Sequence, residues 1–196
     1  MSRWFISDIH GMYDEFEKIL DKIGLSKDDE LYLLGDYVDR GNFSFEVISK
    51  ILDLIDSGFN VTPLLGNHED MMIAGIENKT RDDHGLWIYN GGEETIRSYG
   101  GGEPVEFQEH PYGKLVKTYT KPNYPERHLK FIRELPDRFI GEDFFACHAT
   151  PNPWIENAFE KSARQHLIWE RFSRREFLRH NPDANQIISG HTPQFL

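Results

Sequence analysis

Cysteine is almost absent from this chain of 196 residues, since Cys147 is the single one. An internal disulfide is therefore excluded, and the composition fits a reducing compartment. Long apolar runs are lacking as well, because none approaches the roughly 20 residues of a membrane-spanning helix. Arg3, Asp8 and His10 bring charged and polar groups too early for a cleavable signal peptide. We therefore expect a cytoplasmic protein without a membrane partner.

Basic residues are also in short supply. The chain has 22 Lys and Arg residues against 33 Asp and Glu residues, which gives a formal net charge of −11. A surface of this sign repels nucleic acid, and no basic stripe marks a binding track, so we expect no nucleic-acid partner. Phosphorylated substrates would be repelled too, unless bound divalent cations reverse the sign of the field inside a pocket.

What the chain does have is enough apolar material for one folded domain. Hydrophobic residues make up 38% of the sequence and aromatic residues 13%, which argues against disorder. A chain of this length buries a real core, so we predict a single domain over residues 1–196.

Short apolar runs alternate with amphipathic segments in the first third of the chain. We expect strands at residues 3–7, 30–34 and 60–65. Between them lie two predicted helices, one with Phe16, Ile19, Leu20 and Ile23 on its apolar face and one capped by Ser44. Their ends are predicted at Gly24 and near Gly58. This βαβαβ pattern implies a parallel sheet with right-handed crossovers, in which functional groups gather beyond the carboxyl ends of the strands.

The remainder is predicted in less detail. Residues 80–125 are interpreted as an insert or lid, in which a helical stretch is broken at Gly91-Gly92. After it we expect a helix at 126–135, a hairpin of strands 138–140 and 144–147, a mostly helical stretch at 159–179, and a last strand at 185–189.

Five short polar strings each follow an apolar run. They are Asp8-Ile9-His10-Gly11, Gly35-Asp36-Tyr37-Val38-Asp39-Arg40-Gly41, Gly66-Asn67-His68-Glu69, Cys147-His148-Ala149 and Gly190-His191-Thr192. One such string alone is usually a turn or a structural hydrogen bond. Five in this order indicate a centre that binds two divalent metal ions and hydrolyses phosphoesters.

The side chains of these strings offer the mixed oxygen and imidazole ligands that divalent metals favour in hydrolases. Asp8 and His10 are two residues apart and share one face of an extended segment, while Asp36 is placed to bridge two ions. A hydroxide bridging both ions would be the nucleophile that attacks phosphorus. The expected metal ligands are Asp8, His10, Asp36, Asn67, His148 and His191.

Two further residues are candidates for proton transfer. His68 follows a ligand and can protonate the leaving oxygen, and Asp39 is the carboxylate that would orient it. Arg40 can clamp phosphoryl oxygens with two parallel hydrogen bonds, although it could instead brace its own loop through an ion pair.

With these strings, the chain resembles a PPP-type metallophosphoesterase of the calcineurin-like superfamily, close to the bacterial and phage serine/threonine protein phosphatases. The resemblance runs from Asp8 to His191, and Gly35–Gly41 is its most specific part. It implies an α/β fold, a β-sandwich flanked by helices (αββα). Strands that normally follow Gly-His-Thr would be missing here. The unpaired edge is expected to self-associate or to leave a marginally stable monomer.

The resemblance also implies roles for individual residues. Asp8, His10 and Asp36 would bind one metal, and Asp36 would share the second with Asn67, His148 and His191. Manganese is the usual ion, with iron or zinc as alternatives. His68 resembles the general acid, Asp39 its partner and Arg40 a phosphate arginine. Arg171, in the segment Leu167–Arg171, resembles the second phosphate arginine, with a solvated helix face as the alternative.

Three functional classes remain open. The sequence favours a serine/threonine phosphoprotein phosphatase, whose partner is a phosphorylated protein. The second class is a dinucleoside polyphosphate hydrolase of the diadenosine tetraphosphate type, acting on a small phosphoester. Such hydrolases share this centre but usually lack the aspartate at the position of Asp39. The third is a truncated, non-catalytic paralogue, which the stop at Leu196 favours and the intact ligand set with His68 opposes.

Overall fold

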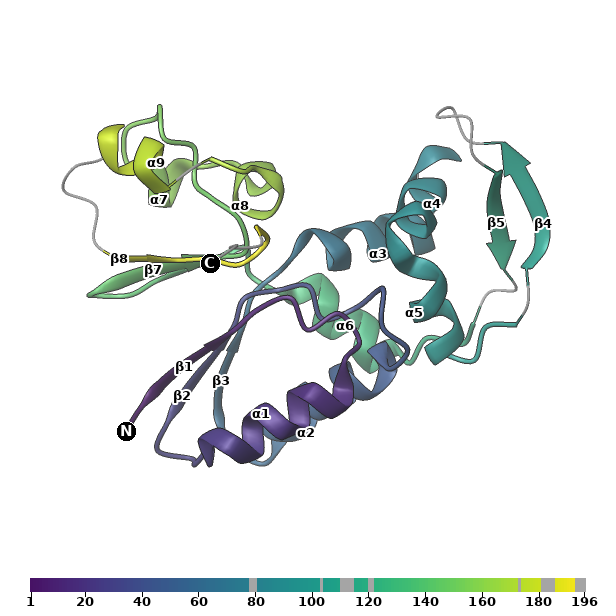
Figure 1. Ribbon diagram of the computed structural model, residues 1–196, viewed down its shortest axis with the longest axis horizontal. Coiled ribbons are helices and arrows are strands. Elements are labelled where there is room, and N and C mark those ends of the chain that lie inside the picture. Colours follow the sequence, from purple (N-terminus) through teal and green to yellow (C-terminus); the bar gives the residue numbers. More distant parts are fainter. Residues whose placement is uncertain are drawn as a thin grey trace.

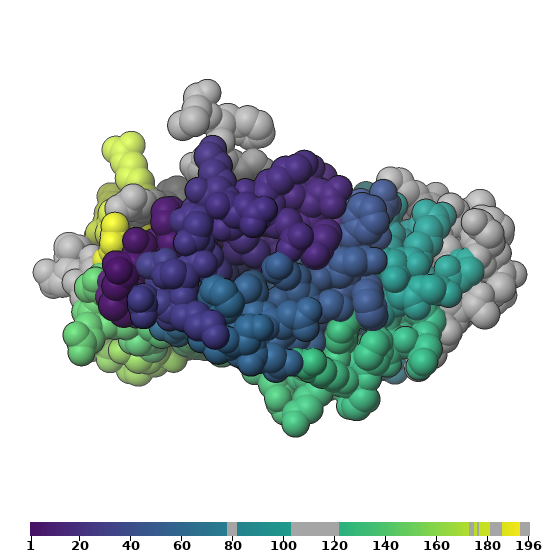
Figure 2. All heavy atoms as spheres, turned by 90° about the horizontal axis from the view of Figure 1, so that it is seen from below, coloured from purple at the N-terminus to yellow at the C-terminus, as the bar shows by residue number. Residues whose placement is uncertain are grey.

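Figure 1 shows the computed structural model of the chain, in which two β-sheets lie face to face between helices. The structure describes residues 1–77, 81–102, 104–109, 115–119, 122–172, 174–180 and 186–192. Viewed from the side of the N-terminal helices, the molecule is elongated, with residues of the first third at the centre of the face (Figure 2). No helix in these ranges is both long and apolar enough to cross a membrane.

The first sheet is the predicted parallel one. Its strands are β1 (Arg3–Ile6), β2 (Glu30–Leu33) and β3 (Asn60–Pro63), paired in that order. The connecting helices α1 (Tyr13–Ile23) and α2 (Ser44–Asp56) lie side by side on its outer face (Figure 1). Each strand ends one or two residues before its predicted end, because the chain turns there into the loops that carry the polar strings.

Local details of these helices only partly follow the prediction. Gly24 ends α1 with a left-handed φ of 59°, as expected for a C-cap glycine. Ile19 was assigned to the buried face but is 42% exposed, because it lies at the margin of the contact with the core. The predicted N-cap role of Ser44 is wrong: its hydroxyl does not cap α2 and instead contacts the Asp39 amide and the Thr95 hydroxyl.

The second sheet is built from the C-terminal part of the chain. β6 (Arg138–Ile140) and β7 (Phe144–Cys147) form the predicted hairpin, and β8 (Gln186–Ile188) pairs with β7 in parallel. The stretch predicted as mostly helical consists of three short helices on the outer side of this sheet (Figure 1). They are α7 (Ala158–Lys161), α8 (Arg164–Trp169) and α9 (Arg174–His180).

Aromatic side chains join the two sheets into the predicted αββα sandwich. Phe5 and Tyr32 of the first sheet meet Phe139 and Phe144 of the second, with ring centroids 5.0–5.3 Å apart. Offset and edge-to-face pairs of this kind each contribute about 0.5–1.5 kcal/mol beyond the area they bury. The sandwich thus brings β7 and β8 beside β1, so that polar strings far apart in sequence share one edge.

Helices and a hairpin extend from the end of the first sheet. They are α3 (Asn67–Glu77), α4 (Arg81–Trp87), the π-helical turn η1 (Ile88–Gly92), α5 (Glu93–Ser98), β4 (Pro104–Glu109), β5 (Leu115–Tyr119) and α6 (Glu126–Glu134). The predicted break falls at Gly91, whose φ is 106°. β4 and β5 form an antiparallel hairpin at the end of the molecule away from the second sheet (Figure 1).

Some predictions concern parts of the chain outside the described ranges. These parts include residues 110–114 of the expected lid, residue 185 of the last strand, and everything after residue 192. The lid role of residues 80–125, the missing strands and self-association through an open edge therefore stay predictions.

The Tyr37 hydroxyl links the ends of β2 and β3. It donates a hydrogen bond to the Leu64 carbonyl oxygen (2.6 Å) and accepts from the Leu64 N–H (3.0 Å) in a fully buried position. We expect Tyr37→Phe to lower the free energy of unfolding by about 1–3 kcal/mol, because the buried Leu64 carbonyl loses this donor, although the Leu64 N–H keeps its hydrogen bond to the Leu33 carbonyl oxygen (2.8 Å). Urea denaturation measures this loss. Tyr32→Phe is the matched control, since its hydroxyl makes only a 3.4 Å contact with Glu30; equal losses would contradict the expectation.

Candidate active site

A cavity of about 700 Å³ opens where the strands of the first sheet end. Eight of the ten predicted site residues line it, namely Asp8, His10, Asp36, Arg40, Asn67, His68, Arg171 and His191. The other two, Asp39 and His148, are fully buried behind the wall and contact His68 and Asp36, respectively. The structure therefore brings all ten predicted residues together at one site.

The backbone of this site is strained. Seven non-glycine residues have a positive φ in the described structure, and six of them are predicted site residues, namely Asp8, His10, Asp36, Asp39, Arg40 and His191. L-residues pay a steric penalty in this region, and such residues persist only where the surrounding structure fixes them. Backbone hydrogen bonds between the loops do so here, such as the one from the His10 N–H to the Asp36 carbonyl oxygen (2.8 Å). The strain is concentrated where the side chains must converge.

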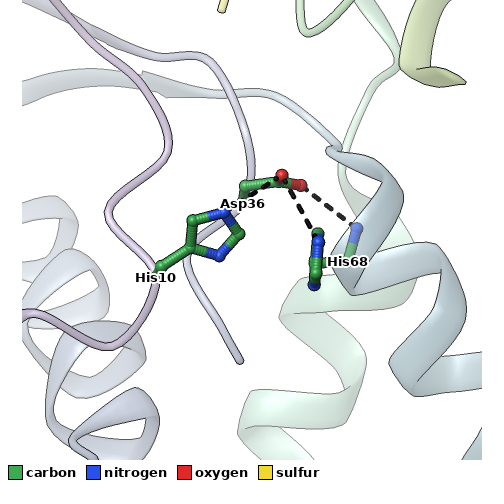
Figure 3. A group of neighbouring side chains, drawn as sticks. All are labelled: His10, Asp36 and His68. Carbon is green, nitrogen blue, oxygen red and sulfur yellow. Dashed lines mark hydrogen bonds and ion pairs between the residues drawn. The ribbon is translucent and has the colours of Figure 1, made fainter. Parts of the chain in front are cut away.

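The Asp36 carboxylate lies at the centre of the site. Its Oδ2 atom is 3.5 Å from Nε2 of His10 and 3.3 Å from Nε2 of His148. Figure 3 shows the His10 and His68 rings on two sides of this carboxylate, and the His68 N–H donates to Oδ1 (3.1 Å). Burial raises the pKa of Asp36, but the neighbouring imidazoles, His148 above all, outweigh it and hold that pKa below its usual value. Asp36 is therefore a buried carboxylate that stays ionised.

Two groups of candidate ligands share Asp36. One consists of His10, Asp36 and His68, and the other of Asp36, His148 and His191. Within the described residues Asp8 belongs to neither group. Its carboxylate accepts hydrogen bonds from the Ser7 hydroxyl and from the His191 N–H (3.1 Å). The structure thus places Asp8 against the loop of the second group, whereas the sequence predicted a pair with His10.

The imidazoles are oriented by backbone carbonyls. Nδ1 of His10 lies 2.9 Å from the Val38 carbonyl oxygen, and Nδ1 of His148 lies 2.7 Å from that of Leu34. In the neutral ring, Nδ1 then carries the proton and Nε2 turns its lone pair towards Asp36. Nε2 of His191 lies 3.1 Å from a backbone oxygen in the same way, so its free nitrogen is Nδ1.

These orientations make the site a cluster of acceptors. Around Nε2 of His148, the Asp36 carboxylate, the Asn67 amide oxygen (3.0 Å) and Nδ1 of His191 (3.1 Å) all lie within contact distance. Imidazole lone pairs and oxygens at these distances repel one another unless a proton, such as one on Nε2 of His148, or a metal cation lies among them. Nitrogen and oxygen donors of this kind suit divalent first-row metals. The residues present therefore fit the expected divalent ions.

Protonation of the imidazoles differs across the cluster. Burial, followed by the His148 charge, lowers the pKa of His191 to about 4, so this ring is neutral at physiological pH. Burial likewise lowers the pKa of His10. For His148, burial acts in the same direction, but the Asp36 charge outweighs it and raises the pKa. Neutral imidazole is the form that binds a metal, so His10 and His191 are already in that form.

The two arginines that line the cavity come from distant parts of the chain. The Arg40 guanidinium lies across the imidazoles of the first group, with Nη1 2.7 Å from Nε2 of His10 and Nη2 3.0 Å from Nε2 of His68. No ion pair involves Arg40 among the described residues, so the alternative of an ion-paired brace has no support there. Nε of Arg171 lies 3.3 Å from Nε2 of His191. Arg171 follows α8 outside any helix and is exposed, so it does not lie on a helix face, and its phosphate contact stays a prediction.

His68 and Asp39 form the predicted pair. Nδ1 of His68 is 2.7 Å from Oδ2 of Asp39, and both residues are buried. A carboxylate at Nδ1 fixes the tautomer and ring orientation, so that Nε2 of His68 points to the cavity and can carry a proton there. The geometry permits acid catalysis by His68.

Sequence reasoning assigned no role to Glu69, Trp87 and Thr95. The fully buried Glu69 carboxylate accepts hydrogen bonds from four backbone N–H groups, at Asp36 (2.8 Å), Tyr37 (2.7 Å), Val38 (3.2 Å) and Gly66 (3.0 Å). Burial and the nearby Asp36 charge raise the pKa of Glu69 to about 7. Its position inside the Gly-Asn-His-Glu string was the one available sign. Trp87 and Thr95 both contact Asp39, and no local pattern marked them.

Comparisons with known proteins agree with this geometry. The chain matches the family model of the calcineurin-like phosphoesterases over residues 1–195, and it belongs to this family. Its fold resembles that of a metallophosphoesterase from Sphaerobacter thermophilus, with a TM-score of 0.60, 20% identity and coverage of 97% of this chain and 59% of that one. A protein serine/threonine phosphatase from Saccharomyces cerevisiae gives a TM-score of 0.59, 17% identity and coverage of 99% and 65%.

Among curated proteins, the chain is similar to a symmetrical bis(5'-nucleosyl)-tetraphosphatase of Buchnera aphidicola subsp. Acyrthosiphon pisum. The two are 41% identical over 88 residues, which are 43% of this chain and 31% of the relative. The match thus spans less than a third of that relative's length.

The position of Asp36 between the two ligand groups leads to a metal-binding prediction. Asp36→Asn should lower metal occupancy of both groups, because the shared anion is lost and a neutral amide binds divalent cations more weakly. Elemental analysis after equilibration with Mn²⁺ and desalting measures the metal per chain. Asp21→Asn serves as the control, because it makes the same substitution at an exposed aspartate. Two metals per chain in Asp36→Asn would contradict the shared role.

Arg171 gives a second prediction. Arg171→Ala should weaken inhibition by inorganic phosphate about tenfold or more while the metal content stays unchanged, since a charge-assisted hydrogen bond contributes about 1.5–3 kcal/mol. Competition assays with phosphate and a chromogenic substrate measure the effect. Arg175→Ala is the matched control, because Arg175 is an exposed arginine on α9. If the two variants bind phosphate alike, Arg171 does not contact it.

Proposed function

We propose that the protein is a metal-dependent phosphoester hydrolase that cleaves dinucleoside polyphosphates of the diadenosine tetraphosphate type. The observation that carries the hydrolase part is the pair of ligand groups that share Asp36 at the floor of a cavity containing two arginines. The substrate class is supported by the 41% identical relative, whose name is bis(5'-nucleosyl)-tetraphosphatase, symmetrical. A small phosphoester is accordingly the proposed partner.

The sequence favoured a phosphoprotein phosphatase, and the comparisons support the alternative better. Curated relatives of this chain carry the tetraphosphatase name. The likeness to the yeast serine/threonine phosphatase, at 17% identity, concerns the fold alone. Fold does not by itself determine substrate, because one scaffold serves many sites.

In the proposed mechanism, two divalent ions would be held by Asp8, His10, Asp36, Asn67, His148 and His191. Bound metal ions supply Lewis acidity and acidify water at neutral pH. Manganese is proposed as the native ion, with iron or zinc as alternatives.

The remaining residues act on the phosphate chain and on the proton. Arg40 and Arg171 would bind phosphoryl oxygens by charge-assisted hydrogen bonds, which counteracts the acidic charge of the whole protein. His68 would deliver a proton from Nε2 to the leaving oxygen, while Asp39 holds Nδ1. In symmetrical cleavage, a P–O bond forms between water and one of the two central phosphorus atoms, and the bond from that phosphorus to the central bridging oxygen breaks. The bridging oxygen leaves as the terminal oxygen of one nucleoside diphosphate, where it takes the proton from His68, and the attacked half becomes the second nucleoside diphosphate.

A second candidate, the serine/threonine phosphatase, is favoured by one observation. The 2.7 Å contact between His68 and Asp39 builds a general acid with a fixed partner. A serine alkoxide needs such a proton to depart, whereas a nucleotide phosphate is a much better leaving group. The aspartate is also the residue expected to be missing from dinucleoside polyphosphate hydrolases. A phosphorylated protein therefore stays the alternative substrate.

Rates on two substrates decide between these functions. With Mn²⁺ present, we expect kcat/KM for diadenosine tetraphosphate to exceed that for a phosphoserine peptide by about tenfold or more, equal to about 1.4 kcal/mol in transition-state free energy. Chromatography of the nucleotide products should show adenosine diphosphate alone. A preference for the phosphopeptide would favour the second candidate. Absence of turnover on both, in protein with metal bound, would support the non-catalytic hypothesis.

A further inference from the structure

The Asp39 carboxylate has a complete set of partners inside the protein. Its Oδ2 atom contacts Nδ1 of His68, and its Oδ1 atom accepts hydrogen bonds from the Trp87 indole N–H (2.9 Å) and the Thr95 hydroxyl (2.7 Å). The Thr95 hydroxyl in turn accepts from the Asp39 N–H (2.8 Å). Asp39 has no exposed surface, so these groups replace water as the donors to its charge. The carboxylate can take one orientation only.

Trp87 is itself held in one position by two glycines. A Cβ atom at Gly75 would lie 2.8 Å from Cε3 of the indole, and one at Gly92 would lie 2.6 Å from Nε1. Both distances are shorter than any normal carbon contact, so the ring fills the space that the missing side chains leave. Close packing against both glycines keeps the buried indole N–H directed at Asp39.

The same segment also contacts Arg40. The carbonyl oxygen of Gly91 accepts a hydrogen bond from the Arg40 N–H (3.0 Å), and a Cβ at Gly91 would lie 2.9 Å from Cγ of Arg40. Gly91 adopts a φ of 106°, which L-residues avoid. The turn from α4 through η1 to α5 therefore contacts two neighbouring predicted site residues, Asp39 and Arg40.

We propose that Trp87 and Thr95 are positioning residues of the active site. They fix the Asp39 carboxylate so that it holds Nδ1 of His68 and directs Nε2, the proton-donating atom, into the cavity. The proposal rests on the proposed phosphoester hydrolysis and adds to it the residues that orient the acid. Neither residue touches the cavity, so each acts through Asp39.

The kinetic test separates orientation of the acid from general stability. Thr95→Val keeps the shape of the side chain and removes the hydroxyl, whereas Thr95→Ser retains it. With a phosphoserine peptide, whose alkoxide needs a proton, Thr95→Val should lower kcat about tenfold or more with KM unchanged, within the range that positioned acid catalysis supplies. With 4-nitrophenyl phosphate, whose leaving group needs none, kcat should stay within about threefold. Thr95→Ser should restore the peptide rate.

Two further variants complete the series. Trp87→Phe removes the indole donor and should show the same selective loss, so it carries the test if Thr95→Val does not fold. Trp154→Phe is the matched control, since Trp154 is 57% exposed and lies outside the cavity wall. Equal losses on both substrates in Thr95→Val and Trp87→Phe would overturn the proposal and leave a packing role.

A spectroscopic measurement tests the contact without turnover. ¹⁵N-labelled protein should show the Nδ1–H resonance of His68, identified by its loss in His68→Asn. This resonance should shift or broaden in Thr95→Val and return in Thr95→Ser. An unchanged resonance in Thr95→Val would overturn the proposal. If the wild-type protein hydrolyses no phosphoester, the proposed function fails, and the resonance still decides whether Thr95 and Trp87 orient His68.

Discussion

The hydrogen bonds that the Glu69 carboxylate accepts are the interaction on which the geometry of the site depends. This carboxylate lies without solvent exposure at the start of α3 and binds the N–H groups of the loops that follow β2 and β3. Four buried donors on one carboxylate satisfy groups that no sheet or helix can pair at this edge. The bonds also fix the backbone of Asp36 in its left-handed conformation. Because Asp36 is the shared carboxylate, the geometry of both ligand groups follows from Glu69.

Under the proposed function, an acidic protein must bind a phosphate chain. The net charge of −11 belongs to the chain as a whole, whereas the cavity wall contains Arg40, Arg171 and several of the candidate metal ligands. Local field at a site is set by the nearest charges and by bound ions rather than by net charge. Under the proposed function, the acidic charge of the remainder does not disfavour a compact phosphoester in the cavity.

The segment from α4 through η1 to α5 supports the site through contacts with Asp39 and Arg40. Trp87 and Thr95 satisfy the buried Asp39 carboxylate, and the Gly91 carbonyl holds the backbone of Arg40. A buried charge is tolerated only where hydrogen bonds replace its hydration. Gly75 and Gly92 are therefore required by the packing of the indole, and Gly91 is required by the backbone conformation of the turn. Residues of the predicted insert at 80–125 therefore contact two candidate active-site residues, Asp39 and Arg40.

The sequence by itself determined the parallel βαβαβ unit, the end of α1 at Gly24 and the meeting of the first three polar strings at one edge of the sheet. These features follow from local periodicity and from strand ends, where polar strings must converge. Tertiary structure alone decided the surroundings of those residues. The contacts of Asp39 with Trp87 and Thr95 join residues 48 and 56 positions apart, and the Ser44 hydroxyl bonds across 51 positions instead of capping its helix. The Asp8 carboxylate accepts a hydrogen bond from the His191 N–H, and Arg171 lies after the end of α8 rather than within it. No local pattern encodes such partners, because each depends on how the two sheets and the later helices pack together.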